Sequence, residues 1–313
     1  MQQFLFSVFL IAAATPATLC LNSTHMSEPR WSSLNVSLVQ YPLVGSFTTD
    51  QLYAKVKSYA EKSSQQGANL VLIPELFSLD LLDFSKSETE QFDQIIEDLF
   101  PSFNIEMQNI ADELNIYILA GSVPIRVQGK IRNRSYLFGP HSNSVFQDKI
   151  FLTPDEVEWG WVGGDKLTVI QAPWGNTAIL ICYDSEIPLI SHTLTQHQLN
   201  LILVPSMTGD SGFTRVRWSA QARAVEHMSY VLLSGTTGAP AEGWEMTAQA
   251  AVLGPSLSGF TPLIAEGNLN EDNQIVFTTL DMEKLRQAKA QGSYYPAKDQ
   301  QSAGELAVEM VSL

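Results

Sequence analysis

The chain has 313 residues, of which 45% are hydrophobic and 16% are charged. This balance is typical of a globular protein with a sizeable core and excludes an intrinsically disordered chain. The formal net charge of −15 disfavours binding to nucleic acid or to an anionic membrane surface.

Residues 1–30 form an N-terminal extension with features of a secretion signal. Phe4–Ala14 is apolar but too short to span a bilayer, and no Lys or Arg precedes it. Met26 offers a second possible start shortly before the first strand-like run. We therefore predict a cytoplasmic protein, with export as the alternative if residues 1–25 act as a signal peptide.

Strand and helix patterns alternate along the first third of the domain. The run Leu34–Gln40 alternates with period two and predicts a strand. Thr48 and Gln51 form a capping-box pattern, which predicts a helix ending near Gly67. A strand, a helix and a strand are then predicted at 70–73, 107–114 and 116–120. This order favours parallel strands covered by helices.

Further along the chain, hairpin patterns indicate mixed strand directions. The two predicted hairpins pair 135–138 with 144–148 and 167–171 with 177–181. Later strands are predicted at 201–204, 230–233, 248–253 and 274–280, and helices at 214–227 and from Asp281 to Gly292. We predict two sheets packed face to face, covered outside by helices, in one domain over 31–291 with a tail at 292–313.

Three chemically active side chains each follow a strand-like run. Glu75 follows Leu70–Pro74, Lys149 follows Ser144–Asp148, and Cys182 follows the apolar residues 178–181. Open α/β sheets usually place their sites at strand ends. Each residue alone has a plain structural reading: a loop-capping carboxylate, a solvated lysine and a buried core cysteine. Together they are a complete set for amide-type hydrolysis.

The chemistry assigns each of these residues a role. A thiol attacks as thiolate, so Cys182 needs a proton acceptor or a neighbouring helix terminus; Asp184 or Ser185 is the predicted cap of that helix. The apolar setting of Glu75 raises a carboxyl pKa toward neutrality, which suits a general base. Lys149 can stabilise the oxyanion of a tetrahedral intermediate.

The segments around these residues resemble the three ordered motifs of the nitrilase superfamily of carbon–nitrogen hydrolases. They are Leu72–Phe77, Phe146–Pro154 and Ile181–Pro188, and the likeness extends over about 33–285. The resemblance implies a four-layer α-β-β-α sandwich of the α/β class, a Glu75-Lys149-Cys182 triad and an eight-layered homodimer, to which residues 215–227 contribute. The amino-acid sequence of these segments is most similar to a bacterial branch whose members are sometimes fused to an acetyltransferase domain.

The resemblance also implies a second glutamate that helps to position the substrate. Glu158 fits this role best by its spacing, and Glu156 remains the alternative. Tyr183 is expected to position substrate through its backbone N–H. Relatives often carry a histidine where this chain has Phe151, and often an arginine where it has Ser185-Glu186, so the pocket is less suited to anionic substrates. Trp159, Trp161, Phe151 and Tyr183 are candidates for an apolar pocket, and residues 207–210 for a substrate wall.

We therefore predict a thiol-dependent amidase acting on a small molecule, with no cofactor. The two cysteines, Cys20 and Cys182, exclude a disulfide framework, and the five histidines show no chelating HExxH spacing, so no metal is expected. The alternatives are hydrolysis of a nitrile on the same triad, a non-catalytic thiol redox or binding protein, and an acyltransferase on the same scaffold.

Overall fold

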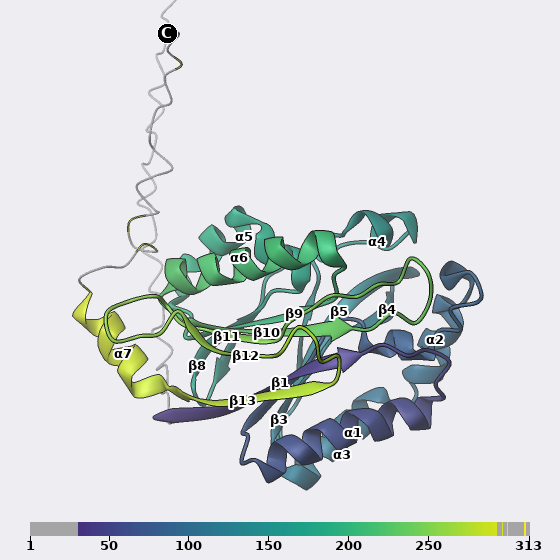
Figure 1. The fold of residues 1–313 in the computed structure, drawn as a ribbon, viewed down its shortest axis with the longest axis horizontal. Coiled ribbons are helices and arrows are strands. Elements are labelled where there is room, and N and C mark those ends of the chain that lie inside the picture. Colours follow the sequence, from purple (N-terminus) through teal and green to yellow (C-terminus); the bar gives the residue numbers. More distant parts are fainter. Residues whose placement is uncertain (1–30, 293–295, 297–298, 300–309, 311–313) are drawn as a thin grey trace, which may run out of the picture.

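A computed structural model describes residues 31–292 and the isolated positions 296, 299 and 310. The predicted N-terminal extension and almost all of the predicted tail lie outside the described residues. Four layers follow one another: helices α1 (Thr49–Gln65) and α3 (Phe103–Leu114), one half of a sheet, the other half, and helices α5 (Pro188–Leu194) and α6 (Asp210–His227) (Figure 1). The predicted α/β sandwich is confirmed.

The first half of the sheet is built from the elements predicted for the start of the domain. Strands β1 (Ser33–Pro42), β2 (Leu70–Ile73) and β3 (Tyr117–Ala120) run parallel. Helices α1 (Thr49–Gln65) and α3 (Phe103–Leu114) cover their outer face. The predicted capping box is present at the start of α1, where Thr48 Oγ1 accepts from the Gln51 N–H and the Gln51 side chain accepts from the Thr48 N–H.

Successive side chains of β1 point alternately to the two faces of the sheet, so this half of the sheet separates two hydrophobic cores. Leu34, Val36 and Leu38 pack between the two halves of the sheet. Val39 and Tyr41 point to the other side, against α1 and α3. Both sets are buried, because successive side chains of a strand point to opposite faces.

The predicted hairpins divide between the two halves of the sheet. Strands β5 (Lys130–Phe138) and β6 (Val145–Asp148) form one hairpin, which extends the first half because β5 pairs with β3. Strands β7 (Val169–Ala172) and β8 (Gly175–Ile179) form the other hairpin, at the edge of the second half. The remaining elements are β9 (Leu201–Ser206), β10 (Tyr230–Thr237), β11 (Ala251–Leu253), β13 (Gln274–Asp281), α5 (Pro188–Leu194), α6 (Asp210–His227) and α7 (Met282–Gln291). Asp281 caps α7, and Gly292 ends it in the left-handed conformation, as predicted.

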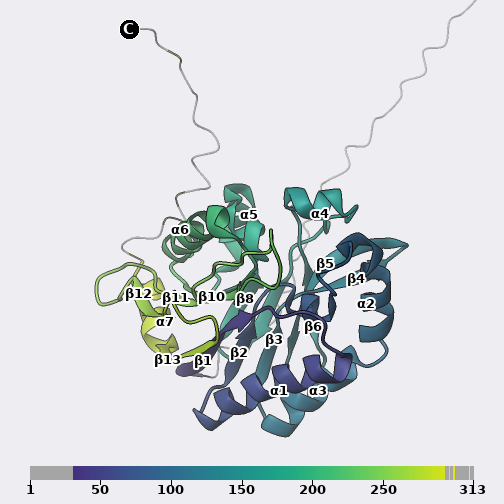
Figure 2. The same ribbon diagram turned by 45° about the vertical axis from the view of Figure 1, so that its right-hand side comes forward.

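The two halves are one continuous hydrogen-bonded sheet, which curls back on itself, instead of two separate sheets. Strand β1 pairs with β13 along residues 33–40, and only its last residues, 40–42, pair with β10. Three further elements had no clear pattern in the sequence: α2 (Phe92–Leu99), β4 (Val123–Val127) and β12 (Leu263–Glu266). Helix α2 packs beside β4 at one edge of the sheet (Figure 2).

Within residues 31–292, no helix combines the length and the apolar character needed to cross a membrane.

Candidate active site

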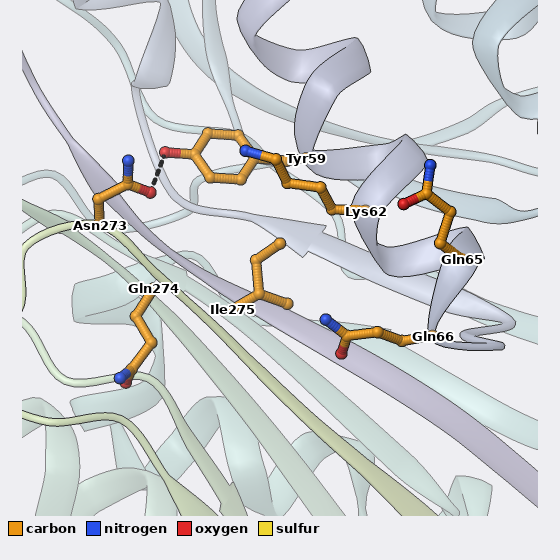
Figure 3. Close-up of a pocket in the computed structure, with 7 residues that line it drawn as sticks. All are labelled: Tyr59, Lys62, Gln65, Gln66, Asn273, Gln274 and Ile275. Atoms are coloured by element: carbon orange, nitrogen blue, oxygen red, sulfur yellow. Dashed lines mark hydrogen bonds between the residues drawn. The ribbon is translucent and has the colours of Figure 1, made fainter.

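The three predicted catalytic residues line one cleft of about 650 Å³. Glu75 follows β2, Lys149 follows β6, and Cys182 lies just beyond β8, so the ends of three strands meet at this cleft. A second hollow lies between α1 and the start of β13, where the Tyr59 hydroxyl donates to Asn273 Oδ1 (Figure 3). Its seven lining residues include no thiol and no carboxylate, so the chemistry resides in the first cleft.

Lys149 lies between two buried carboxylates. Its Nζ is 2.8 Å from Glu75 Oε1 and 2.6 Å from Glu156 Oε2. All three side chains are almost fully buried. A single ammonium therefore faces two carboxylates in a low-dielectric setting, where charges interact far more strongly than in water.

Glu156, and not Glu158, is the glutamate that contacts Lys149. Helix α4 (Pro154–Glu158) begins just after Thr153, whose N–H donates to Glu156 Oε2 at 2.9 Å. This contact turns the Glu156 side chain inward, whereas Glu158 is exposed and lines the outer part of the cleft. The Thr153-x-x-Glu156 capping-box pattern was present in the sequence and would have distinguished the two residues.

Asn133 joins the two carboxylates and was not predicted from the sequence. Its Nδ2 lies 2.9 Å from Glu75 Oε1 and 2.7 Å from Glu156 Oε1, and its backbone C=O accepts the Lys149 N–H at 2.8 Å. The one signal available in the sequence was an amide residue between two arginines, Arg132 and Arg134. In the structure Asn133 is buried, whereas the two arginines pair with Asp148.

Cys182 opens a short 3₁₀ turn, Cys182–Glu186, and has a φ of 46°. This left-handed conformation is costly for a residue with a Cβ and is a form of strain often found at functional sites. The Ser206 hydroxyl donates to Cys182 Sγ at 3.3 Å, and Sγ lies 3.8 Å from the Met207 carbonyl oxygen. The Met207 N–H donates to Glu75 Oε2 at 2.8 Å, so residue 207 touches both the thiol and the carboxylate.

Burial sets the direction of the pKa shift for Cys182 and Glu75, whereas the two carboxylates set it for Lys149. Burial and the nearby Glu75 carboxylate raise the pKa of Cys182, so the resting residue is a neutral thiol. Burial also raises the pKa of Glu75, although Lys149 opposes this shift. Burial opposes the charge of Lys149, but the carboxylates of Glu75 and Glu156 outweigh it and raise its pKa, which keeps the ammonium charged.

The predicted capping roles of Asp184 and Ser185 were wrong. Helix α5 begins at Pro188 without a side-chain cap. Asp184 instead accepts the backbone N–H groups of Ile150 and Phe151, and the Ser185 hydroxyl donates to the Cys182 carbonyl. These bonds tie the turn that carries the thiol to the segment that carries Lys149.

The remaining predicted site residues divide between the cleft and the protein interior or surface. Tyr183, Trp159 and residues 207–209 line the cleft, together with Trp244, which was not predicted. Trp161 is buried against Phe92 and Phe151 is 45% exposed, and neither lines the cleft. No three His, Cys, Asp or Glu side chains are grouped as metal ligands within the part of the chain that the structure describes.

Several known proteins are similar to this chain. Probable hydrolase YhcX of Bacillus subtilis is 29% identical over 278 residues, which are 85% of this chain and 53% of that protein. The chain thus spans about half the length of that relative. The mouse omega-amidase NIT2 is 23% identical over 282 residues, which are 83% of this chain and 93% of that protein.

Solved structures show the same fold. Saccharomyces cerevisiae Nit3, a member of the nitrilase superfamily, superposes with a TM-score of 0.70 at 20% identity, covering 85% of this chain and 97% of Nit3. An amidase of this superfamily from Nesterenkonia superposes with a TM-score of 0.65 at 22% identity, covering 84% and 97%. The model of the carbon-nitrogen hydrolase family matches residues 35–290. The chain therefore belongs to the carbon-nitrogen hydrolase family.

Proposed function

We propose that this protein is an amidase that cleaves a small-molecule amide through a thioester on Cys182. The observation that carries the proposal is the cluster at the base of the cleft: a thiol on a strained turn, beside one ammonium held between two buried carboxylates. The membership in the family and the amidase names of similar proteins support this reaction class.

The first half of the reaction forms the acyl-enzyme. Glu75 accepts the thiol proton while Cys182 Sγ bonds to the carbonyl carbon and the C=O electron pair moves to oxygen. Lys149 and the Tyr183 backbone N–H stabilise this oxyanion. The intermediate collapses with cleavage of the C–N bond, and Glu75 returns the proton to the departing nitrogen, which leaves as ammonia or an amine.

The second half releases the acid. A water molecule transfers a proton to Glu75 as its oxygen attacks the thioester carbon. Collapse of this second intermediate breaks the C–S bond, and the proton held by Glu75 passes to the sulfur. Glu156 and Asn133 act as positioning residues, because their hydrogen bonds hold Lys149 and Glu75 in place.

The experiment is a panel of small amides, carbamoyl compounds and nitriles, with ammonia release as the readout. We expect turnover of amides and its loss in Cys182→Ser, with circular dichroism showing that the variant is folded. Turnover of nitriles alone would assign nitrile hydrolysis. Rapid oxidation of the thiol without turnover of any compound would indicate a redox or binding protein, and acyl transfer to an added amine would indicate an acyltransferase.

We also propose a homodimer that forms through α5 and α6. Leu189 on α5 and Trp218 on α6 are 70% and 73% exposed, which is unusual for large apolar side chains. Sedimentation analysis should find a dimer that Trp218→Glu weakens. A monomer for the unmodified protein would refute the proposal.

The bacterial branch and the cellular location are further proposals. The Bacillus relative extends well beyond the part that matches this chain, which supports the branch with additional domains. N-terminal sequencing of the native protein would distinguish cytoplasmic retention from export with cleavage of residues 1–25.

A further inference from the structure

The cleft carries more negative than positive side chains. Among its lining residues only Lys149 and Arg215 are cationic. Six carboxylates share the same lining: Glu75, Glu88, Asp155, Glu156, Glu158 and Glu186. Lys149 is already paired with two of these carboxylates, Glu75 and Glu156.

The second cation is also neutralised. Arg215 Nε lies 3.0 Å from Glu186 Oε2, and its Nη1 donates to the Ser211 carbonyl at 2.7 Å. The arginine is therefore engaged at the mouth of the cleft, and an incoming anion would have to compete with Glu186 for it. An anionic substrate finds no unpaired cation among the described residues that line the cleft.

Two acidic residues on one wall have no cationic partner among the described residues. Glu88 lies in the short turn Glu88–Glu90, and Glu158 is the last residue of α4. Asp155 in the first turn of α4 has a structural explanation, because a helix N-terminus favours an acidic side chain. The same argument disfavours Glu158, which stands at the carbonyl end of its helix.

The aromatic side chains of this wall hold Glu88 and add a second means of binding a cation. The Trp159 indole N–H donates to Glu88 Oε1 at 3.3 Å, which leaves the other carboxylate oxygen free to accept. The Trp159 ring stacks on Trp244, with ring centroids 6.2 Å apart and planes 12° apart. Both rings line the cleft, and indole faces attract cations.

We propose, on the basis of the amidase function above, that the substrate is an amide that also carries an ammonium or guanidinium group. The wall formed by Glu88, Glu158, Trp159 and Trp244 receives that cation, while the amide group reaches Cys182. The net charge of −15 also attracts cationic molecules to the protein as a whole.

The test compares three amides of the same length: hexanamide, hexanamide with a terminal ammonium and hexanamide with a terminal carboxylate. We expect kcat/KM for the ammonium compound to exceed that for hexanamide by about tenfold, the effect of one charge-assisted hydrogen bond. The carboxylate compound should be the poorest. The preference should decrease at high ionic strength, because salt screens the partly exposed carboxylates.

Charge-removing variants locate the effect. Glu88→Gln and Glu158→Gln should each reduce the preference for the ammonium compound. Glu90→Gln is the matched control, because Glu90 lies in the same turn and is exposed but does not line the cleft. It removes the same charge and should leave the preference unchanged.

The possible outcomes separate this inference from the proposed function. Equal or better cleavage of hexanamide or its carboxylate derivative would overturn the inference and leave the amidase intact. Cleavage of none of the amides would overturn the amidase proposal. Calorimetry with hexylamine and hexanoate would then decide the inference, which requires that only the amine binds.

Discussion

Two lysine–carboxylate clusters in the described part of the chain lie wholly or partly inside the protein, and they differ in charge and in access. At the candidate active site, Lys149 faces both Glu75 and Glu156 and shares a cleft with Cys182. In the first layer of helices, Lys55 pairs with Asp80 at 2.7 Å. The Lys55 cluster contributes nothing to the lining of that cleft.

Asp80 is saturated by donors. It accepts the Tyr41 hydroxyl at 2.6 Å, the backbone N–H of Val44 at 2.7 Å and that of Gly45 at 3.1 Å, in addition to Lys55. This cluster connects α1 to the loop that follows β1. All of these hydrogen bonds stabilise the local fold, and the cluster exposes no reactive group.

The two lysines have opposite pKa shifts. Burial lowers the pKa of Lys55, because its single carboxylate partner does not compensate for the loss of water. Burial acts in the same direction on Lys149, but two carboxylates reverse the shift and raise its pKa. An ion pair inside the protein is thus not itself a sign of catalysis; the surplus carboxylate and the neighbouring thiol are what distinguish the candidate active site.

The largest expected effect comes from removing each lysine in turn. Lys149→Met should lower kcat/KM by about 10²–10³-fold, since it removes an oxyanion donor. Lys55→Met should leave the activity of folded protein unchanged but lower the free energy of unfolding by about 3 kcal/mol, because it leaves the buried Asp80 carboxylate without its cationic partner. Amide turnover and urea unfolding measure the two effects. Equal loss of turnover in both variants would remove the distinction between the clusters.

The second comparison is between the two candidate glutamates. Glu156→Gln should lower kcat about tenfold or more with little change in KM, because it leaves Lys149 with a single carboxylate partner. Glu158→Gln should instead raise KM for a cationic amide and leave kcat unchanged. Steady-state kinetics on the ammonium-bearing hexanamide separate the two. A loss of kcat in Glu158→Gln and a rise of KM alone in Glu156→Gln would show instead that Glu158 is the second glutamate.

The third prediction concerns the pH dependence of the Glu75 base. Catalysis needs ionised Glu75, and burial raises its pKa, so kcat/KM should fall on the acid side at a higher pH than an ordinary carboxyl would give. Asn133→Ala removes a hydrogen bond to the ionised form and should move this limb upward by about one pH unit. A uniform loss of activity at every pH, with the limb unmoved, would limit Asn133 to a structural role.

The smallest expected effect is a change in how the free energy of unfolding depends on pH. Burial raises the pKa of Asp184 from 3.8 to about 7, although the N–H groups of Phe151 and Ile150 oppose the shift. The folded protein then keeps a proton that the unfolded chain releases, so the contribution of Asp184 to stability falls as pH rises from about 4 to about 7. The Asp184→Asn variant lacks this loss, so its free energy of unfolding should increase relative to that of the unmodified protein as pH rises over this range.

His227 provides the opposite slope as a control. Burial, assisted by Lys289 and Arg223, lowers its pKa from 6.5 to about 3. The unfolded chain binds the proton more readily, so the contribution of His227 to stability is lost as pH falls from about 6.5 toward 3. In His227→Gln, that loss should disappear. Unfolding curves across pH that show the same slope for both variants would contradict these assignments.

The sequence was sufficient to predict the fold class and to single out three side chains that the structure places in one cleft, and the reason is physical. Glu75, Lys149 and Cys182 each follow an apolar run, and strand ends converge in this kind of sheet. Asn133, Ser206 and Met207 could not be found in the same way, because they lie within or just after strands and gain their meaning only from neighbours distant in the sequence. The pairing of β1 with β10, which joins the two halves of the sheet, is likewise a purely tertiary feature.

The most direct test of the account is to stop the reaction during turnover and identify the acylated residue by mass spectrometry. Incubation with an amide substrate followed by acid quenching should give a protein heavier by the acyl group, with the adduct on the peptide that contains Cys182. Hydroxylamine should remove the adduct, as expected for a thioester. An adduct on another residue, or full turnover by Cys182→Ser, would contradict the account.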